Sequence, residues 1–328
     1  MKRLGASLVV AFTFAALLMG GYSQAAPATK VDYPTRSVTV IVPYTAGGGT
    51  SVAAEMLTTV MAKVLNTPVQ IQYRPGGGTQ IGATELARSK PDGYTVGYAG
   101  VPTTTLSYLD PERKAIYTRK SFRQIATHFT LPHVLAVRAD SPYKTVKDLL
   151  DAAKAKPEVI KFASNGFMSG THVGGLRFEK AGGVKFAFVH FDGDAPTINA
   201  ILGGHVDVTS LSVAAILSHV KTGAIRPLGI LDNVENPFMP GVKTLASQGF
   251  NVTSGTIMGL CAPAGTPTDV VTILANAVKT AQTDPGLQQK MNALGFTMIY
   301  VSLDDYEKIW ADVEAQTIPI LEEIRKQK

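Results

Sequence analysis

The sequence predicts a two-lobed α/β fold, in which each lobe is a mostly parallel sheet covered by helices and a hinge joins the lobes. Two observations predict it. Strand-like apolar runs alternate with amphipathic helical segments along the chain, and no low-complexity linker interrupts the 328 residues. Such alternation is typical of parallel sheets with helices packed on their faces, and a chain of this length exceeds what one core normally holds.

The first third of the chain has the pattern of a βαβαβ unit. The run "SVTVIV" at 37–42 is almost entirely β-branched, as expected for a strand that is buried on both faces. Residues 51–65 have the pattern of a helix whose apolar stripe consists of Val52, Met56, Val60 and Val64, with Leu57 and Met61 beside it. The segments 68–73 and 93–99 have the pattern of strands, and 79–90 between them has the pattern of a helix.

The alternation then repeats and suggests a division into lobes. We expect further strands at 133–139, 160–164, 185–191, 205–211, 225–231, 255–265 and 297–301, and further helices at 145–155, 170–181, 196–204, 212–223, 267–282, 284–294 and from Ser302 onward. A chain that crosses between lobes near 128–131 and 252–256 needs no linker. We therefore expect lobe one to comprise 30–129 plus 255–328 and lobe two 130–254, with a ligand cleft at the hinge.

The N-terminus has the three parts of a secretory signal peptide. Lys2 and Arg3 precede an apolar run, and small residues at Ser23 and Ala25 form a cleavage site. The run is nearly long enough to be a membrane anchor, but glycines interrupt it and no cysteine for lipid attachment lies near the site. We expect residues 1–25 to be removed on export to the periplasm.

Composition argues against several classes of protein. The 31 basic and 25 acidic residues are dispersed, so nothing supports nucleic-acid binding, and a mild positive charge is compatible with a small anionic ligand. Cys261 is the only cysteine, so no intrachain disulfide is possible, and we expect it to be a small core residue. None of the six histidines has the helical spacing of a zinc pair, and we expect no metal or other cofactor.

Two similar glycine-rich loops each follow an expected strand and open an expected helix. Residues 47–57 (GGGTSVAAEML) and 76–86 (GGGTQIGATEL) are identical at six of eleven positions. Free N–H groups and the helix dipole at such a position favour an anion, and glycine lets a ligand approach the backbone closely. Plain turn glycines are the alternative for either loop alone, but two such loops at one sheet edge favour a binding role.

Neither loop matches a nucleotide-binding motif. A P-loop has Lys-Ser or Lys-Thr after its last glycine, where "TS" and "TQ" stand here, and the dinucleotide fingerprint also fails in both loops. A third loop, 164–172 (SNGFMSGTH), supplies hydroxyl groups and glycines between an expected strand and an expected helix. Such groups suit the oxygens of a carboxylate.

Four stretches of the chain resemble the Bug family, the extracytoplasmic solute receptors of tripartite tricarboxylate transporters. They are "YPTRSVTVIVPYTAGGGT", "YRPGGGTQIGATELARSKPDGYT", "SNGFMSGTHVGGLRFE" and "INAILGGHVDV", and the similarity runs from about residue 33 to the C-terminus. The resemblance implies a monomeric, type II-like periplasmic binding protein. It also implies two partners, a small organic carboxylate and the integral-membrane permease subunits of a tripartite tricarboxylate transporter.

The resemblance further implies that the loops at 44–51, 76–80 and 164–172 hold the ligand. The chain departs from the family pattern at Ser51, where Asp is usual, and at 191–193, where "FDG" replaces the common Tyr-Lys-Gly. Both departures fall near the expected cleft. The expected ligand-binding residues are Tyr44, Ala46, Gly47, Gly48, Gly49, Thr50, Ser51, Gly77, Gly78, Thr79, Ser164, Gly166, Ser169, Gly170, Thr171, His172 and Asp192.

Two of these side chains have alternative roles. His172 contacts the ligand or braces its own loop. Asp192 faces the ligand or is solvated at the rim of the cleft, while Asp194 is expected to cap the helix that contains Pro196.

A secreted hydrolase with a glycine loop as oxyanion hole is the alternative function. The sequence has no Gly-x-Ser-x-Gly elbow and no recognisable set of nucleophile, base and orienting group, so no catalytic residue is assigned. We therefore expect a binding protein and not an enzyme, one that captures a small organic carboxylate between its lobes and delivers it to the permease.

Overall fold

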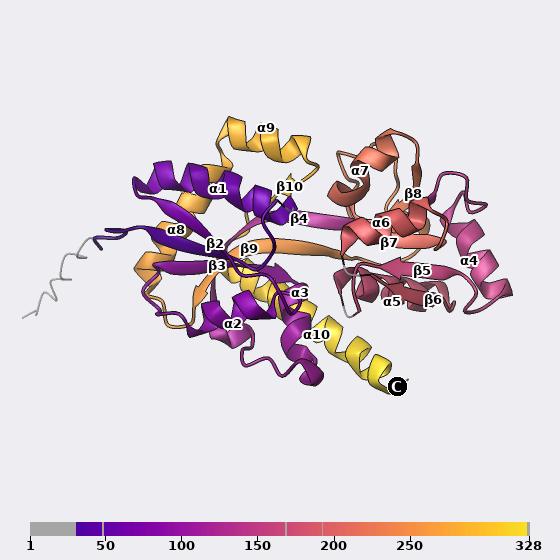
Figure 1. Ribbon diagram of the computed structural model, residues 1–328, viewed down its shortest axis with the longest axis horizontal. Coiled ribbons are helices and arrows are strands. Elements are labelled where there is room, and N and C mark those ends of the chain that lie inside the picture. Colours follow the sequence, from indigo (N-terminus) through magenta and orange to yellow (C-terminus); the bar gives the residue numbers. More distant parts are fainter. Residues whose placement is uncertain (1–30, 48, 168, 192, 327–328) are drawn as a thin grey trace, which may run out of the picture. The chain divides into compact units, whose positions relative to one another are not determined.

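The computed structural model describes residues 31–47, 49–167, 169–191 and 193–326, and the fold described below begins at Tyr33 (Figure 1). The expected signal peptide, Gly48 and Asp192 lie outside the described residues. In chain order the helices and strands are β1 (Val38–Val42), α1 (Gly49–Leu65), β2 (Val69–Tyr73), α2 (Gln80–Arg88), β3 (Thr95–Val101), α3 (Thr103–Leu109), β4 (Phe122–Arg138), α4 (Val146–Ala155), β5 (Lys161–Ser164), α5 (Gly170–Gly182), β6 (Ala187–His190), α6 (Asp194–Leu202), β7 (Val208–Ser212), α7 (Val213–Lys221), β8 (Ile225–Ile230), β9 (Gly255–Pro263), α8 (Thr268–Gln282), α9 (Pro285–Ala293), β10 (Thr297–Met298) and α10 (Leu303–Lys326).

The strands of the described residues form one sheet in the order β2-β1-β3-β9-β4-β7-β5-β6, and β8 and β10 also pair with β4. The pairs at both ends, β2-β1-β3 and β7-β5-β6, are parallel, as the alternation of strands and helices predicts. The pairs in the centre are antiparallel. The antiparallel centre arises because β9 returns to lie between β3 and β4 (Figure 1).

Strand β4 is longer than the sequence predicts, because it begins at Phe122 and not near residue 133. Its residues up to Pro132 pair with β9, and those from His133 onward pair with β7. This change of partner lies close to the crossing point expected near 128–131. The division of the chain into two lobes stays a proposal, to which this pairing gives support.

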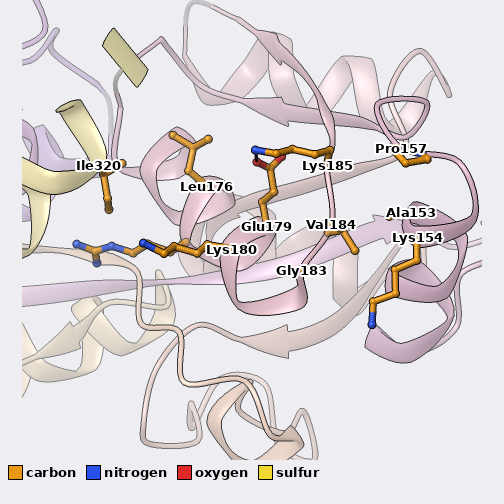
Figure 2. A pocket seen from close by; sticks show the side chains of 11 residues that line it. Ala153, Lys154, Pro157, Leu176, Glu179, Lys180, Gly183, Val184, Lys185 and Ile320 are labelled. Atoms are coloured by element: carbon orange, nitrogen blue, oxygen red, sulfur yellow. Dashed lines mark hydrogen bonds and ion pairs between the residues drawn. The ribbon is translucent and has the colours of Figure 1, made fainter. Parts of the chain in front are cut away.

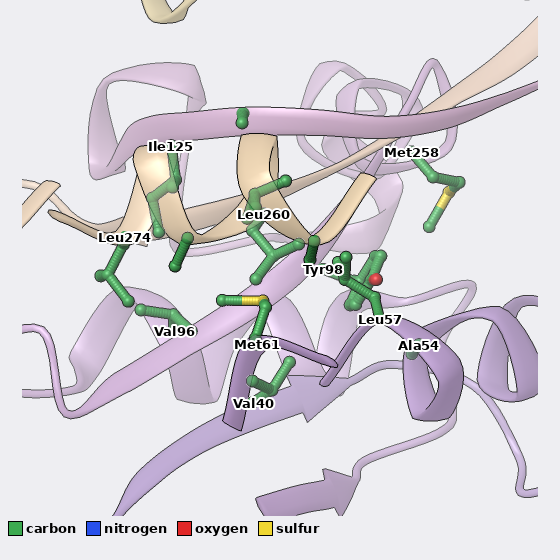
Figure 3. Close-up of a cluster of buried hydrophobic side chains, with 14 of the residues drawn as sticks. Val40, Ala54, Leu57, Met61, Val96, Tyr98, Ile125, Met258, Leu260 and Leu274 are labelled. Carbon is green, nitrogen blue, oxygen red and sulfur yellow. The ribbon is translucent and has the colours of Figure 1, made fainter. Parts of the chain in front are cut away.

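The side chains of β1 point alternately to the two faces of the sheet and contribute to a hydrophobic cluster on each face. Val38, Val40 and Val42 face one side of the sheet and pack with α1 and α8, whereas Ile41 faces the other side and packs with α2 and α10. Figure 3 shows the first of these clusters, with Leu57 of α1 among the labelled residues. These strand side chains are at most 1% exposed, and each such burial stabilises the fold by roughly 1.5–3 kcal/mol.

The C-terminal part of β4 likewise places alternate side chains on the two faces of the sheet, where they join two further hydrophobic clusters. Leu135 and Val137 pack in a cluster with side chains of α4 and α5, while Val134 and Ala136 pack with α6 and α7. Helices therefore cover both faces of the sheet at both ends.

In α1, the predicted stripe of Val52, Met56, Val60 and Val64 is only partly buried, and Val64 is 40% exposed. The face that the fold buries carries Ala54, Leu57 and Met61, which lie beside that stripe on the helix.

Most elements begin and end within a few residues of the ranges predicted from sequence, with three differences. Helix α3 was not predicted, β4 is longer, and β10 covers only Thr297–Met298. The last helix begins close to the predicted Ser302, whose hydroxyl accepts a hydrogen bond from the backbone N–H of Asp305 (3.3 Å).

Candidate functional site

The first glycine loop joins β1 to α1. Gly47 has a φ of +79°, and a Cβ at this position would meet no heavy atom within 4 Å. A glycine is therefore favoured at position 47 because of the left-handed backbone conformation, and not because a side chain would clash with neighbouring atoms. Gly49 and Thr50 form the first turn of α1, and Ala46 is exposed.

Two polar side chains of this first loop are bound within the protein. The Ser51 hydroxyl is fully buried and donates to the carbonyl oxygen of Thr45 (2.7 Å), so it braces the loop from beneath. The Tyr44 hydroxyl lies 3.9 Å from the Met258 sulfur, and burial raises the pKa of this tyrosine. The backbone of the loop is thus better placed than these two side chains to contact a ligand.

The second glycine loop joins β2 to α2 and consists of left-handed backbone. Gly77, Gly78 and Thr79 have φ values of +60°, +58° and +79°. Thr79 directly precedes α2 and is 4% exposed, and its hydroxyl oxygen has no hydrogen-bond partner among the described residues. A buried hydroxyl without a partner is costly, which marks this position as one where a bound group would be stabilising.

The third loop, 164–172, is held by a network of short polar contacts. The Thr171 hydroxyl donates to the side-chain oxygen of Asn165 (2.6 Å) and lies 2.9 Å from the Ser169 hydroxyl. Ser169 also caps α5 through the backbone N–H of His172. The Ser164 hydroxyl lies 2.7 Å from His190 Nδ1 and donates to the carbonyl oxygen of Gly166 (3.1 Å), and Gly170 is buried at the start of α5.

His172 lies in a cluster of rings that the sequence did not predict. Its ring centroid is 4.4 Å from His190, 5.0 Å from Phe188 and 5.4 Å from Phe167. Burial, together with the nearby His190, lowers the pKa of His172 to about 3. The imidazole is therefore neutral at physiological pH and packs as an aromatic ring, which supports the bracing role.

Asp194 does not cap α6, and this prediction from sequence is wrong. The helix begins at Asp194 itself and Gly193 occupies the cap position, without a side-chain hydrogen bond. The Asp194 carboxylate instead accepts a hydrogen bond from the side-chain amide of Asn165 (2.7 Å) in the third loop. Burial raises the pKa of Asp194, although the bond from Asn165 opposes this shift.

A cavity of about 360 Å³ brings the first loop close to Asp194. Gly47 and Thr50 line one part of it, and Asp194 and the start of α7 line another. Its remaining walls are largely apolar. Its lining residues are Gly47, Thr50, Val52, Leu131, Asp194, Ser212, Ala214, Ala215, Leu294 and Phe296.

Arg113 contacts both the second and the third loop, and it was not identified from the sequence as a candidate site residue. Its guanidinium lies over the second loop, where Nη1 would be 2.8 Å from a Cβ on Gly78. Its Nη2 lies 3.5 Å from the carbonyl oxygen of Phe167 in the third loop. No local pattern marks Arg113, because it is far from both loops along the chain.

A second cavity, of about 420 Å³, contains none of the expected site residues (Figure 2). It lies beside α5, and its wall includes the lysines Lys154, Lys180 and Lys185. Lys185 is paired with Glu179 (2.7 Å), which also accepts a hydrogen bond from the backbone N–H of Phe186. We therefore place the candidate site at the three loops and not at this cavity.

Within the part of the chain that the structure describes, no three His, Cys, Asp or Glu side chains are grouped so that they could hold a metal ion. In the same part, no helix combines the length and the apolar character needed to cross a membrane. Cys261 is buried in the core beside Tyr306 and Trp310, as the sequence predicts.

Comparison with known sequences identifies relatives along nearly the whole chain. The family model described as "Tripartite tricarboxylate transporter family receptor" matches residues 52–325. A UPF0065 protein from the gbd 5' region of Cupriavidus necator is 28% identical and covers 96% of this chain and 95% of its own. Protein BugT of Bordetella pertussis is 26% identical and covers 88% of this chain and 89% of its own.

Comparison with solved structures supports the same grouping. A TctC solute-binding protein from Polaromonas, solved without ligand, has a TM-score of 0.78 at 27% identity and covers 89% of this chain and 99% of its own. MatC from Rhodopseudomonas palustris with bound malate has a TM-score of 0.76 at 25% identity and covers 88% and 99%. Another R. palustris protein, solved with adipate, has a TM-score of 0.75 at 26% identity and covers 90% and 98%. The predicted fold class, an α/β periplasmic binding protein, is confirmed.

Proposed function

Because the chain belongs to the family of tripartite tricarboxylate transporter receptors, we propose that it is exported to the periplasm, captures a small organic carboxylate and delivers it to a membrane permease. The family is one of solute-binding receptors and not of enzymes. MatC holds malate and a second similar structure holds adipate. Both ligands are dicarboxylates, which supports a carboxylate as the ligand of this chain.

The observation that carries the proposal is the cavity between the first glycine loop and Asp194. Gly47 and Thr50 flank the start of α1, where N–H groups without helical partners and the helix dipole favour an anion. Asp194 is joined to the third loop through Asn165. The cavity therefore lies beside two of the three loops that the resemblance implies.

The second loop contributes through Arg113, which lies against Gly78 and close to Phe167 of the third loop. A ligand held between these loops contacts elements from both ends of the sheet. This arrangement supports the proposed division into lobes 30–129 plus 255–328 and 130–254, with β4 and β9 as the connections. The proposed ligand contacts are the backbones of the first and second loops and the hydroxyl groups of the third.

A ligand screen tests the proposed function. Purified mature protein is titrated with malate, adipate, succinate, citrate and benzoate, and its melting temperature is followed beside a generic esterase assay. We expect at least one carboxylate to raise the melting temperature in a saturable way, and no ester hydrolysis above background. Ester hydrolysis without any carboxylate-dependent stabilisation would favour the secreted hydrolase instead.

Export is tested separately in the native host. The expected result is a soluble periplasmic protein whose N-terminus lies near Ala26. Recovery of protein that begins at Met1, or recovery in the membrane fraction alone, would contradict export with cleavage after Ala25.

A further inference from the structure

Arg113 ends the short 3-10 turn Pro111–Arg113, and its charge lies directly against the second glycine loop. A Cβ on Gly78 would approach Nη1 to 2.8 Å, and Gly78 also has a φ of +58°. Only a residue without a side chain fits both conditions. The glycine at 78 is therefore what allows the guanidinium to approach the backbone of the loop.

The segment that carries Arg113 is tied to the same loop by two further hydrogen bonds. The Ser107 hydroxyl donates to the carbonyl oxygen of Gly78 (3.0 Å), and the side-chain amide of Gln80 donates to the carbonyl oxygen of Arg113 (2.9 Å). Each bond joins one end of the 107–113 segment to the loop. The position of the charge is therefore coupled to the position of the loop backbone.

Among the described residues, the guanidinium of Arg113 makes only long contacts. Nε lies 3.5 Å from the Asp110 carboxylate, Nη1 lies 3.4 Å from the Ser107 hydroxyl and Nη2 lies 3.5 Å from the Phe167 carbonyl oxygen. Good N–H···O bonds are about 2.7–3.2 Å long, and an arginine has five N–H donors. The side chain is 24% exposed, so its charge is shielded from water without being closely paired.

Other arginines of the protein bind their partners more closely. Arg74 lies 2.6 Å from Glu85, Arg119 lies 2.9 Å from Glu314, and Arg123 donates to the carbonyl oxygen of Thr266 over 2.7 Å. Arg119 is a close match to Arg113 in exposure, at 23%. The long contacts of Arg113 therefore do not follow from its degree of burial.

A second, independent observation at the same loop is the buried Thr79 hydroxyl, which has no partner among the described residues. It lies at the start of α2, where the first backbone N–H groups also lack helical partners. The backbone N–H groups of Gln80 and Ile81 already donate within the loop, to the carbonyl oxygens of Gly77 (3.2 Å) and Gly76 (3.4 Å). The donor that lacks a partner among the described residues is therefore the Thr79 hydroxyl, and it occurs at the same loop as the weakly paired cation of Arg113.

We propose that Arg113 is a specificity-determining residue, which pairs with a charged carboxylate of the ligand at the second glycine loop; this inference rests on the proposed function. The planar guanidinium suits a carboxylate, to which it donates two parallel hydrogen bonds. Asp110 competes for the same cation in the absence of ligand. The protein therefore discriminates between a carboxylate and the corresponding amide at this end of the ligand.

The test uses isothermal titration of the mature protein with the dicarboxylates of the screen and with the monoamide of the best one. Arg113→Gln is expected to weaken binding of the dicarboxylate by about tenfold or more, since a hydrogen bond to a charged group is worth about 1.5–3 kcal/mol. The preference for the dicarboxylate over its monoamide should shrink in the same variant. Arg113→Lys should restore part of both effects, because it keeps the charge and loses the planar fork.

The variant Asp110→Asn tests whether Arg113 binds the ligand or only forms a structural ion pair with Asp110. Asparagine keeps the cap that Asp110 provides to the N–H of Glu112 and removes the competing charge. If Arg113 binds the ligand, this variant binds the dicarboxylate more tightly, opposite to Arg113→Gln. Equal weakening by both variants would assign the pair to structure and overturn the inference. If Arg113→Gln fails to fold, Asp110→Asn alone still tests the inference, because an affinity for the dicarboxylate that does not rise above that of the wild type would overturn it.

Arg119→Gln is the matched control, and it is expected to lose stability without any change in affinity. Wild-type affinity should also fall more steeply with added NaCl than that of Arg113→Gln, because salt screens the pair. A wild type that binds a dicarboxylate, beside a folded Arg113→Gln that binds it equally well, would overturn this inference alone. A wild type that binds no carboxylate of the panel would overturn the proposed function and, with it, this inference.

Discussion

The side-chain amide of Asn165 donates a hydrogen bond to the carboxylate of Asp194 over 2.7 Å, and this bond joins the third loop to the start of α6. Asn165 is itself held by Thr171, whose hydroxyl donates to the asparagine side-chain oxygen (2.6 Å). The bond positions a partly buried acid on the wall of the cavity that the first glycine loop also lines. The charge of Asp194 therefore bears on the stability of the fold and, in the proposed site, on which ligand the cavity accepts.

Asp194→Asn is expected to stabilise the protein at neutral pH. Burial raises the pKa of Asp194 above its ordinary value of 3.8, so the folded state binds the proton more tightly than the unfolded state. The free energy of unfolding contributed by this group therefore falls as pH rises from about 3.8 through the raised pKa. Urea unfolding at pH 3.5 and pH 7 should give the variant a larger free energy of unfolding than the wild type only at pH 7. An equal difference at both pH values would contradict the raised pKa.

Gly78→Ala and Gly183→Ala should affect folding similarly and binding differently. Both glycines have left-handed backbone, with φ of +58° and +61°, so an alanine at either costs about 1–2 kcal/mol. At Gly78 the added Cβ also displaces the guanidinium of Arg113, whereas at Gly183 it meets nothing within 4 Å. We expect ligand affinity to fall in Gly78→Ala alone, measured on protein shown to be folded by its melting curve. Unchanged affinity in Gly78→Ala would remove the second loop from the site.

His172→Phe should make the protein less sensitive to acid. The pKa of His172 is lowered from 6.5 to about 3, chiefly by burial and also by the neighbouring His190. The unfolded state therefore takes up a proton that the folded state rejects, and stability is lost as pH falls from about 6.5 toward 3. Phenylalanine keeps the ring packing with Phe167 and Phe188 and removes this loss. The variant and the wild type should differ in the slope of unfolding free energy between pH 6.5 and pH 4, and parallel slopes would argue against the prediction.

A bound carboxylate should close the proposed cleft. A ligand that contacts loops from both proposed lobes binds the closed form better and shifts the population toward it. At about 100 times Kd it should add roughly 2.7 kcal/mol of stability, and small-angle scattering should give a smaller radius of gyration with ligand. Identical scattering with and without a ligand proven by calorimetry would exclude closure about a hinge.

The sequence by itself determined the local architecture on which the site is built. The β-branched run of β1, the apolar stripe of α1 and the glycines between them predict a strand, a helix and a tight loop, since each depends on neighbours in the chain. The repeat of this unit at β2 and α2 predicts the second loop in the same way. Membership of the family could be inferred from the same stretches, because these loops carry its motifs.

Tertiary structure alone decided which groups meet at those loops. Asn165 and Asp194 are joined by a side-chain bond across 29 positions of the chain, and Arg113 reaches Gly78 and Phe167 from a turn that no periodic pattern marks. Pro132 lacks a backbone donor and is unfavourable in a central strand. The sequence therefore predicted a strand only from residue 133, whereas β4 begins at Phe122. In the fold Pro132 pairs with Gly255, where a Cβ would lie 3.0 Å from the proline Cα. Local propensity cannot encode such contacts, because their energy arises only when distant segments pack together.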